Sequence, residues 1–515
     1  MQLSFGRGRR CPHGRRCPLT LPGRHCYPSR VEPVGAAPTG PALAVSNREQ
    51  FTVYDWWVPR VIFPVYERLS GRRLWTEVLR LRALQWRPPE ELEARAIQKL
   101  RPLLAHAMAH VPYYRDLFKQ AGFHPDDLRT VADLSRVPIT TKATLRDNFP
   151  HRTTAENLPA SRRWKMTTSG STGSLFEFYA DPAGMDSWDS SYLFFLEWAG
   201  AAFWDPQIII SSPPHRSYRA NIPRSPMLTQ GVRRLLLGQR AVYLPGMEIT
   251  PATLRAQIGG LPPGRSYVIR TYPSYAARLA AQLLEEGVGL PAYPKVVISG
   301  GETLTPADAA TIQAAFHCPV LNHYSTWEVP HMAQTCPDNP GLVHVNSERV
   351  ILRVVRDDGT PAAPGESGRV VITALSNFTM PFINYELDDW AVAGEVCSCG
   401  RGLPTLLSLE GRAGEMIRTP SGRVIAPTSL GHFLRLGCHA VPYIWEFQGV
   451  QTAAGTVVLR VVPTPRFTAE FARTLEDKLR GFLGPGTKVR VETVDVIPRE
   501  ASGKRLIIKS ELPSH

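Results

Sequence analysis

Residues 265–301, RSYVIRTYPSYAARLAAQLLEEGVGLPAYPKVVISGG, decide the fold of this 515-residue chain. Two short apolar runs in it, RSYVIRTY and PKVVISGG, are typical of buried β-strands. Between them, YAARLAAQLLEEG has the spacing of an amphipathic helix that ends at a glycine. Because a strand, a helix and a second strand in this order build a parallel sheet, the segment predicts an α/β fold.

The sequence before residue 265 predicts another strand of this sheet and, before that strand, a mainly helical region. PQIIISS predicts another buried strand of the same sheet, which should occupy about 165–330. Residues 50–150 are predicted to be helical, and RPPEELEARAIQKLRPLLAHAMAHV should be one helix that Pro102 kinks or splits. VPYYRDLFKQAG predicts a further helix that Gly122 closes.

The C-terminal half changes character twice. HVNSERVILRVV and GRVVITAL predict two strands that the turn RDDGTPAAPGESG joins into an antiparallel hairpin. After GRAGEMIRTPSG, two strand patterns, the helix TAEFARTLEDKLRGFLG and KVRVETVDVI indicate a small α+β unit. The chain is therefore expected to combine a large α/β domain with an α+β C-terminal domain.

Composition and charge are those of a globular protein, with 43% hydrophobic and 20% charged residues. The sequence contains no run of about 18 apolar residues, so it predicts no membrane span. Half of the net charge of +14 comes from seven arginines in residues 1–30, so a nucleic-acid surface is not expected. Residues 1–45 read as a disordered basic extension whose cysteines and histidines fit no zinc pattern. The sparse cysteines elsewhere favour a reducing, cytoplasmic location.

A loop of small polar residues, TTSGSTGS at 167–174, is the first functional signal. Glycines let backbone amides approach a polyphosphate, and hydroxyls donate further hydrogen bonds to it. No lysine follows the last glycine, so the loop is not a Walker A motif. Considered by itself, the segment is equally compatible with a flexible linker.

Six segments in a fixed order resolve that ambiguity, because together they resemble the adenylate-forming superfamily, in its phenylacetate-CoA ligase and CapK-like branch. The segments are TTSGSTGS (167–174), SGGETL (299–304), HYSTWE (323–328), FINYELDDWA (382–391), GRAGEMI (411–417) and PREASGKRLIIKSEL (498–512). The resemblance covers roughly residues 60–515 and, after the basic extension at 1–45, implies an ATP- and acid-binding domain at 46–411 and a small mobile domain at 412–515.

The resemblance also implies site residues. The phosphate loop would hold the β- and γ-phosphates of ATP through Thr167, Ser169, Gly170, Ser171, Thr172 and Gly173. The nucleotide would further contact Gly301, Glu302, Tyr324, Ser325, Asp389 and Arg412. Glu328 would hold Mg²⁺, and Lys504 would bridge the acid carboxylate and the α-phosphate as the catalytic lysine.

The implied reaction is attack of a carboxylate on ATP, which gives an acyl-adenylate and pyrophosphate, followed by transfer of the acyl group to CoA. The acid-binding pocket should involve residues 209–220, 270–276 and 299–304, whose aromatic and polar side chains suit an aromatic acid. The expected partners are a small carboxylic acid, ATP and CoA, with a homodimer also open. An amine, a carrier protein or a sugar remains an alternative acceptor.

Several positions depart from the motifs that the chain resembles. Ser325 and Trp327 replace a glycine and a threonine, and Gly414 lies at or beside the position expected for a hinge acid. Asn384 replaces an arginine and Asp388 replaces a glycine. The last two leave open a catalytically degenerate binding or scaffold protein on the same fold.

A second group of residues has metal-binding character. Cys397 and Cys399 lie one residue apart, and the predicted hairpin should bring them close to Cys336 and His344. Three thiolates and one imidazole would form a closed structural zinc site, for which His331 is an alternative ligand. The other interpretation is a buried cysteine beside a tight turn, and the sequence does not decide between the two.

Overall fold

The computed structural model describes most of the chain from residue 53 onward. The described ranges are 53–168, 176–181, 184–211, 241–246, 248–262, 265–412, 415–440, 442–500 and 503–512. The chain divides into two compact units, Met1–Arg48 and Glu49–His515, and all described residues belong to the second. The predictions for residues 1–45 therefore lie outside the described residues.

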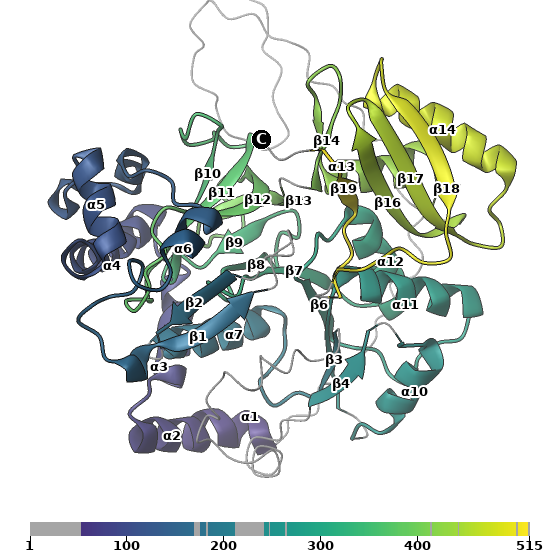
Figure 1. The fold of residues 1–515 in the computed structure, drawn as a ribbon. Helices are drawn as coiled ribbons and strands as arrows, with labels where there is room; N and C mark the ends of the chain where they lie inside the picture. Colours follow the sequence, from purple (N-terminus) through teal and green to yellow (C-terminus); the bar gives the residue numbers. More distant parts are fainter. Residues whose placement is uncertain are drawn as a thin grey trace, which may run out of the picture. The chain divides into compact units, whose positions relative to one another are not determined.

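An eleven-stranded mixed sheet forms the centre of the second unit (Figure 1). Its strand order is β10-β11-β12-β13-β9-β8-β7-β6-β5-β3-β4. The parallel part contains β3 (Gln207–Ser211), β4 (Ala241–Pro245), β5 (Val268–Thr271), β6 (Val296–Gly300) and β7 (Val320–Tyr324). The predicted strands in PQIIISS, RSYVIRTY and PKVVISGG are therefore confirmed, together with their parallel pairing.

Helices cover both faces of the parallel strands, because their residues alternate between two apolar clusters. On one face, α7 (Met185–Trp198) packs Leu196 against Val268, Ile298 and Leu321. The other face is covered by α10 (Pro251–Gly259), α11 (Pro273–Glu286) and α12 (Pro306–Phe316). The helix predicted between the strands of residues 265–301 is α11, and it ends at Gly287 with a φ of 63° as a left-handed glycine cap.

The N-terminal region is helical, as the sequence predicts. The helical segments are α1 (Val53–Trp57), η1 (Val58–Ile62), α2 (Phe63–Ser70), α3 (Leu74–Leu84), α4 (Pro89–His110), α5 (Pro112–Ala121), η2 (Pro125–Asp127), η3 (Val131–Arg136), α6 (Lys142–Asn148) and η4 (Ala160–Arg162). Gly122 closes α5 with a φ of 59°, as expected. Of the two effects expected of Pro102, a kink or a split, the split does not occur, because α4 runs without a break from Pro89 to His110, 22 residues with Pro102 inside. Pro102 is exposed, while Leu100, Leu103 and Leu104 bury the opposite side of the helix, so packing maintains the helix despite the missing donor.

The antiparallel part of the sheet contains the predicted hairpin, β10 (Val350–Val355) with β11 (Ser367–Ala374). It continues through β12 (Tyr385–Ala393), β13 (Thr405–Arg412), β9 (Val343–Val345) and β8 (Ala333–Thr335). One detail of the prediction is wrong, since HVNSERVILRVV forms two strands rather than one. The break falls at Asn346–Arg349, where the Arg349 and Val350 amides turn back to the Asn346 carbonyl.

A separate hairpin carries the ends of the predicted phosphate loop. β1 (Trp164–Thr168) and β2 (Phe176–Ala180) pair antiparallel, with Thr168 opposite Phe176. Phe176 and Phe178 are fully buried in the same cluster as Tyr385 of β12. The loop between the two strands, residues 169–175, lies outside the described residues.

The C-terminal region has the predicted α+β character. Its four-stranded sheet has the order β18-β17-β16-β19, from β16 (Ile444–Ala453), β17 (Thr456–Pro463), β18 (Lys488–Thr493) and β19 (Ile508–Ser510). α14 (Ala469–Leu483) packs Leu475, Leu479 and Leu483 on this sheet. Before it come β14 (Ile417–Arg418), β15 (Val424–Ile425), α13 (Pro427–His432) and η7 (Phe433–Gly437). This region has a hydrophobic core of its own, which the large sheet does not share.

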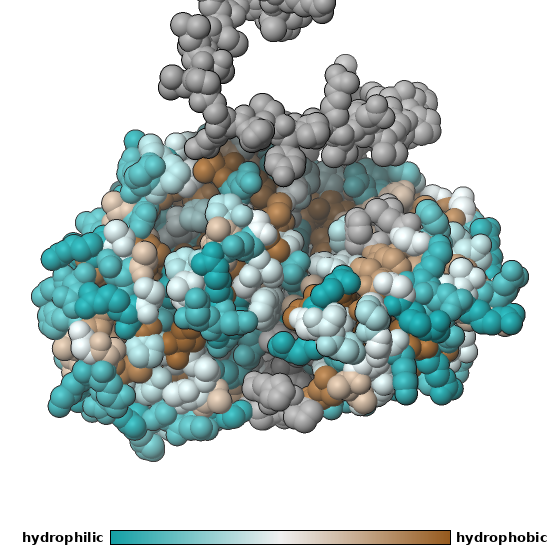
Figure 2. All heavy atoms as spheres, turned by 90° about the horizontal axis from the view of Figure 1, so that it is seen from above, coloured by the Kyte–Doolittle hydropathy of each residue, from teal (hydrophilic) through white to brown (hydrophobic). Residues whose placement is uncertain are grey.

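The surface has no membrane-spanning element among the described residues, since no helix there is long and apolar enough to cross a bilayer. In Figure 2, hydrophilic residues cover most of the rim of the face shown, and hydrophobic residues are seen mainly between them. That pattern agrees with burial of the apolar residues in the clusters described above.

Candidate active site

The candidate site forms where the parallel strands end, as is usual for ligand sites in open α/β sheets. β6 runs directly into Gly301 and Glu302, and β7 ends at Tyr324 followed by Ser325. Gly301 has a φ of 84°, which favours glycine, and a side chain there would meet the Tyr272 ring at 2.9 Å. This close approach explains why the strand-end segment has a glycine at this position.

Tyr324, Asp389 and Arg412 form the corner that the sequence assigns to the nucleotide. The Tyr324 hydroxyl donates to Asp389 Oδ2 at 2.6 Å, and Arg412 Nε lies 3.6 Å from Asp389 Oδ1. Asp389 and Arg412 face each other because they are paired residues of β12 and β13. Burial raises the pKa of Asp389, and the charge of Arg412 opposes that rise. The fold therefore brings three residues together from motifs far apart in the sequence.

Glu328 occupies the loop between β7 and β8 and is buried. Its Oε1 accepts a hydrogen bond from the Tyr385 hydroxyl at 3.3 Å and lies 3.6 Å from Lys142 Nζ. Burial raises the pKa of Tyr385, and the nearby Glu328 carboxylate raises it further. A buried carboxylate that one lysine partly neutralises is a suitable ligand for a hard cation.

Lys142 is a candidate that sequence reasoning missed. Its ammonium lies 5.6 Å from the centre of the Phe176 ring, at the start of β2 directly after the predicted phosphate loop. A polar residue at the start of a helix gives no signal by itself. Its location beside both Glu328 and Phe176 depends on how α6 packs on β2 and β12, which only the tertiary structure shows.

Lys504 reaches the site from the C-terminal region. Its Cε lies 3.7 Å from the position of a Cβ built on Gly301. Burial lowers the pKa of the Lys504 ammonium, Arg412 lowers it further, and Glu302 and Asp389 oppose the shift. The lysine is therefore close to both the strand-end glycine and the Asp389–Arg412 corner.

Hydrogen bonds hold the segment that carries Lys504 against the large sheet, where the C-terminal trace runs back towards α11 and α12 (Figure 1). The Tyr275 hydroxyl donates to the Gly503 carbonyl at 2.8 Å, and the Arg505 amide donates to Glu302 Oε1 at 2.6 Å. Glu302 also accepts from the Ser274 amide and hydroxyl at 3.0 and 3.1 Å. Both carboxylate oxygens of Glu302 thus have partners, so this residue anchors the lysine segment.

The phosphate-loop residues are described only at their edge. Thr167 lies in β1 opposite Glu177 and is half-buried. Ser169, Gly170, Ser171, Thr172 and Gly173 lie outside the described residues, so their predicted contacts stay predictions.

The two departures that raised doubt about activity have structural explanations. Asn384 and Asp388 both have a left-handed backbone, with φ of 50° and 60°. Asparagine and aspartate tolerate this region better than other non-glycine residues, so Asp388 keeps a conformation that glycine would favour. Asn384 is buried, donates to the Val137 carbonyl and accepts a hydrogen bond from Arg353. Asn384 therefore has a buried arginine, Arg353, as its direct hydrogen-bond partner.

The hinge segment is described on both sides of 413–414, and Gly414 itself lies outside the described residues. Burial raises the pKa of Glu415 to about 8, an effect that Arg412 opposes. In the segment that the sequence predicts to be the hinge, an acid, Glu415, therefore directly follows Gly414.

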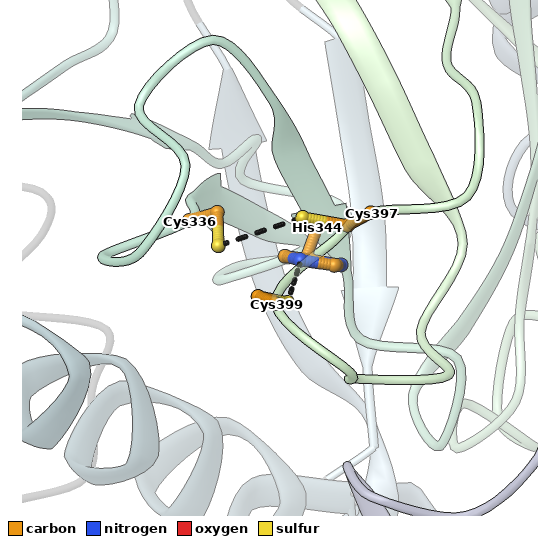
Figure 3. A group of neighbouring side chains, drawn as sticks. All are labelled: Cys336, His344, Cys397 and Cys399. Carbon is orange, nitrogen blue, oxygen red and sulfur yellow. Dashed lines mark hydrogen bonds between the residues drawn. The ribbon is translucent and has the colours of Figure 1, made fainter. Parts of the chain in front are cut away.

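The predicted metal ligands converge on one point beside β9 (Figure 3). Cys336, His344, Cys397 and Cys399 each contribute a ligand atom, and these atoms lie within 4.8 Å of one another. β9 pairs with β13, with His344 opposite Thr405, and this pairing brings the Cys-x-Cys turn to the histidine. The alternative ligand His331 lies elsewhere, hydrogen-bonded to His323.

The spacing within this cluster fits a tetrahedral ion. Cys397 Sγ lies 3.9 Å from Cys336 Sγ, and Cys399 Sγ lies 3.3 Å from His344 Nε2. Zn–S bonds of about 2.3 Å in a tetrahedron require sulfur atoms about 3.8 Å apart. His344 Nδ1 lies 3.2 Å from the Leu403 carbonyl, which can only accept, so Nε2 is free of its proton when the ring is neutral. The donor set therefore fits zinc.

Comparisons with known proteins agree with the sequence motifs. Residues 418–511 match the family described as the CapK C-terminal domain. The phenylacetate-coenzyme A ligase of Escherichia coli is 29% identical over 314 residues, which cover 58% of this chain and 67% of that protein. The enzyme of the same name from Aromatoleum evansii is 24% identical over 81% of this chain and 93% of its own. Protein CapK of Staphylococcus aureus is 20% identical, over 76% of this chain and 83% of its own length. The resemblance to this branch is confirmed.

Solved structures confirm the fold. A 2-hydroxyisobutyryl-CoA ligase in the postadenylation state aligns with a TM-score of 0.66 and 20% identity, over 83% of this chain and 91% of that one. The same ligase in its thioesterification state aligns with a TM-score of 0.54 and 21% identity, over the same shares of both chains. At this level of identity the likeness concerns the fold, which is that of adenylate-forming CoA ligases.

Proposed function

We propose that this chain, which shares its motifs with phenylacetate-CoA ligases and CapK and its fold with adenylate-forming ligases, is an ATP-dependent carboxylate–CoA ligase. It would convert an acid to an acyl-adenylate and then to an acyl-CoA thioester. The observation that carries the proposal is the position of Lys504 beside Gly301, close to Asp389 and Arg412. These residues lie up to 203 positions apart along the chain, from 301 to 504.

Lys504 would stabilise the charge that develops when the acid attacks the α-phosphate. Burial and the neighbouring Arg412 disfavour the protonated amine before substrate arrives. An incoming carboxylate and triphosphate restore the protonated form, so the ammonium gains most when both substrates are bound. A cation placed in this way stabilises the transition state without forming a covalent bond.

Asp389 would bind the ribose, because its two oxygens can accept hydrogen bonds from paired hydroxyl groups. The Tyr324 hydroxyl and Arg412 hold the carboxylate in position. The Tyr324 ring would lie against the adenine, and Ser325 would border the same pocket. Glu328 is the residue that would hold Mg²⁺, a cation that neutralises phosphate charge when it is bound.

Acid-dependent exchange of pyrophosphate into ATP tests the proposal directly. Exchange with an acid, followed by a thioester only when CoA is added, would support the CoA ligase. Exchange without a CoA-dependent thioester would favour an amine, carrier-protein or sugar acceptor instead. No exchange with any acid of a broad panel, and no ATP binding by calorimetry, would leave a degenerate scaffold protein.

The four-residue cluster would hold a structural Zn²⁺ beside the site. All its ligands come from the chain and no position is left for water, so a catalytic role is not proposed. Native mass spectrometry should show one zinc per chain, and Cys397→Ser should lose this zinc. The same variant should lower the free energy of unfolding by about 2 kcal/mol or more. Cys438→Ser, a buried cysteine outside the cluster, is the matched control and should retain the metal. A well-folded wild type without metal would contradict the site.

A cytoplasmic location is part of the proposal, since the five described cysteines are all unpaired thiols. A homodimer is also proposed, and a mass measured in dilute solution would test it. Nucleic acid is not proposed as a partner, and no segment is proposed to span a membrane.

A further inference from the structure

The first helical run of the described chain exposes a concentration of apolar side chains. The run extends from Val53 to Ser70 through α1, η1 and α2, at the edge of the second unit (Figure 1). Fifteen large hydrophobic residues are exposed in the described part of the chain, and one third of them lie in this run. They are Val53, Trp56, Trp57, Val65 and Leu69. An accumulation of this kind on a surface marks an interaction site.

The exposed residues share one face of the run. Exposure recurs at positions 53, 56, 57, 60, 64, 65, 68 and 69, which is the three- to four-residue spacing of one helix face. The opposite face is already packed, because Val58 and Phe63 are buried in a cluster with Trp75. A helix that is apolar on both sides is stable in water only if both sides are covered. The fold covers one side of this run and leaves the other for a partner.

The charged residues of the run are divided between the same two faces. Arg60 and Arg68 are exposed among the apolar residues, and neither forms an ion pair within the described part of the chain. Asp55 and Glu67 are half-buried, and each accepts a hydrogen bond of 2.8 Å from a residue later in the chain. The exposed face, which we call the α1–α2 face, therefore combines apolar side chains with positive charge.

The sequence before the run adds more positive charge. Residues 1–48 contain eight arginines and a single acid, Glu32. Only residues 49–52 separate this basic segment from α1. A partner of the α1–α2 face is therefore also within reach of a strongly cationic stretch of chain, which favours a partner with a negatively charged surface.

From these features we infer that the α1–α2 face docks on the surface of an anionic lipid membrane. Trp56, Trp57 and Leu69 would enter the boundary between headgroups and acyl chains, where tryptophan is especially favoured. Arg60 and Arg68 would reach the lipid phosphates. The run is 18 residues long and contains four charged residues, so it would lie in the plane of the membrane rather than cross it. The inference does not depend on the proposed ligase function.

Two other partners fit the α1–α2 face less well. In a symmetric dimer, the face of one copy would meet the same face of the other, and the arginines of both would have no acid between them. A nucleic acid would pair with the arginines, but its phosphate backbone offers no apolar surface to cover the tryptophans and leucine. Only a lipid surface satisfies both the charge and the apolar side chains.

Co-sedimentation of the full-length chain with lipid vesicles tests the inference. One set of vesicles is phosphatidylcholine alone, and in the other about a third of the lipid is phosphatidylglycerol. The chain should bind the anionic vesicles about tenfold or more tightly than the neutral ones at low salt, and added salt should weaken that binding.

Variants locate the binding on the α1–α2 face. Trp56→Gln combined with Leu69→Gln should weaken binding to the anionic vesicles by about tenfold or more, because both inserted side chains become polar. Both positions are exposed, so Tm should stay unchanged. The matched control is Leu284→Gln combined with Val288→Gln, which replaces two exposed apolar residues of α11 and the turn after it and should retain full binding.

Fluorescence gives a reading of insertion itself. Lipids brominated in their acyl chains should quench part of the tryptophan emission of the wild type. That quenching should largely disappear in Trp56→Phe combined with Trp57→Phe, which keeps the face apolar but removes the two reporter rings. Quenching that persists in this variant would place the contact elsewhere and overturn the inference.

Three other results would overturn the inference. The first is absence of binding to anionic vesicles at low salt. The second is equal binding by the wild type and the variant with Trp56→Gln and Leu69→Gln, which would mean that the arginines of residues 1–48 bind lipid without the face. The third is a dimer that this variant dissociates, in a chain that binds no vesicles, which would identify a second copy as the partner.

Discussion

Replacing Lys504 should impair the first half-reaction, adenylation, much more than the second, thioester formation. Lys504→Ala is expected to reduce acid-dependent pyrophosphate exchange by about 10²–10³-fold, since the half-buried cation that would lie at the reacting phosphate is lost. Thioester formation from a supplied acyl-adenylate should change by less than about threefold, because that step no longer needs the lysine. Rapid-quench assays of each half-reaction measure both.

The matched control for this lysine is Lys509→Ala, which removes an exposed lysine that pairs with Glu511 on the same C-terminal segment. It should leave both half-reactions intact. Equal loss of both half-reactions in Lys504→Ala would contradict the role assigned to it.

Asp388 shows how a motif glycine can be replaced at a modest cost in stability. Its φ of 60° costs a non-glycine residue about 1–2 kcal/mol, and aspartate less than most. Asp388→Gly should therefore raise the free energy of unfolding by about 0.5 kcal/mol, measured by urea denaturation. Asp388→Asn, which removes only the charge, should change the free energy of unfolding by less than Asp388→Gly does. A less stable glycine variant would show that the aspartate side chain stabilises the strand.

At the scale of the element, α4 shows packing overriding a local signal. Pro102 removes one helical hydrogen bond, yet buried leucines on the opposite side keep the 22-residue helix continuous. Pro102→Ala should restore the donor and raise stability by about 1–3 kcal/mol, measured as an upward shift in Tm. Gln98→Ala, at an exposed position one turn earlier, should change stability by less than about 0.5 kcal/mol. No gain in Pro102→Ala would mean that the helix has already relaxed around the proline.

The strands illustrate which predictions a pattern supports. Apolar runs in residues 265–301 predicted β5, α11 and β6 correctly, because both burial and periodicity are local properties. HVNSERVILRVV read as one strand, and the turn at Asn346–Arg349 was missed. The backbone there turns back on itself between two strands that occupy different positions in the sheet. The stretch has no glycine or proline, and its turn signal is limited to Asn346 and Ser347, two residue types that also favour turns.

At the scale of the whole molecule, the docking of the lysine segment should control adenylation. Tyr275→Phe removes the hydroxyl that donates to the Gly503 carbonyl, but keeps the ring 5.1 Å from Arg499. The lost hydrogen bond should weaken the docking of the lysine segment by about 1 kcal/mol, which should slow adenylation by about five- to tenfold. Thioester formation from a supplied acyl-adenylate should stay unchanged.

Tyr267→Phe is the control, because its hydroxyl also donates to a carbonyl, that of Ala292, but both residues lie just before strands of the parallel sheet and not in the lysine segment. It should lower stability by a similar amount without separating the half-reactions. An unchanged adenylation rate in Tyr275→Phe would argue against this docked position as the adenylating state.

The sequence by itself determined the α/β fold, the order of the motifs and the identity of Lys504, Asp389 and Glu328 as candidates. It could do so because strand periodicity and motif order are properties of the chain alone. Only the tertiary structure decided which groups meet, such as Lys142 with Glu328 and Arg353 with Asn384. The hydrogen bond from Gln334 Nε2 to the Phe195 carbonyl also belongs to that level, since the two residues lie 139 positions apart along the chain. Contacts of this kind follow from strand order and helix packing, which no short stretch of sequence encodes.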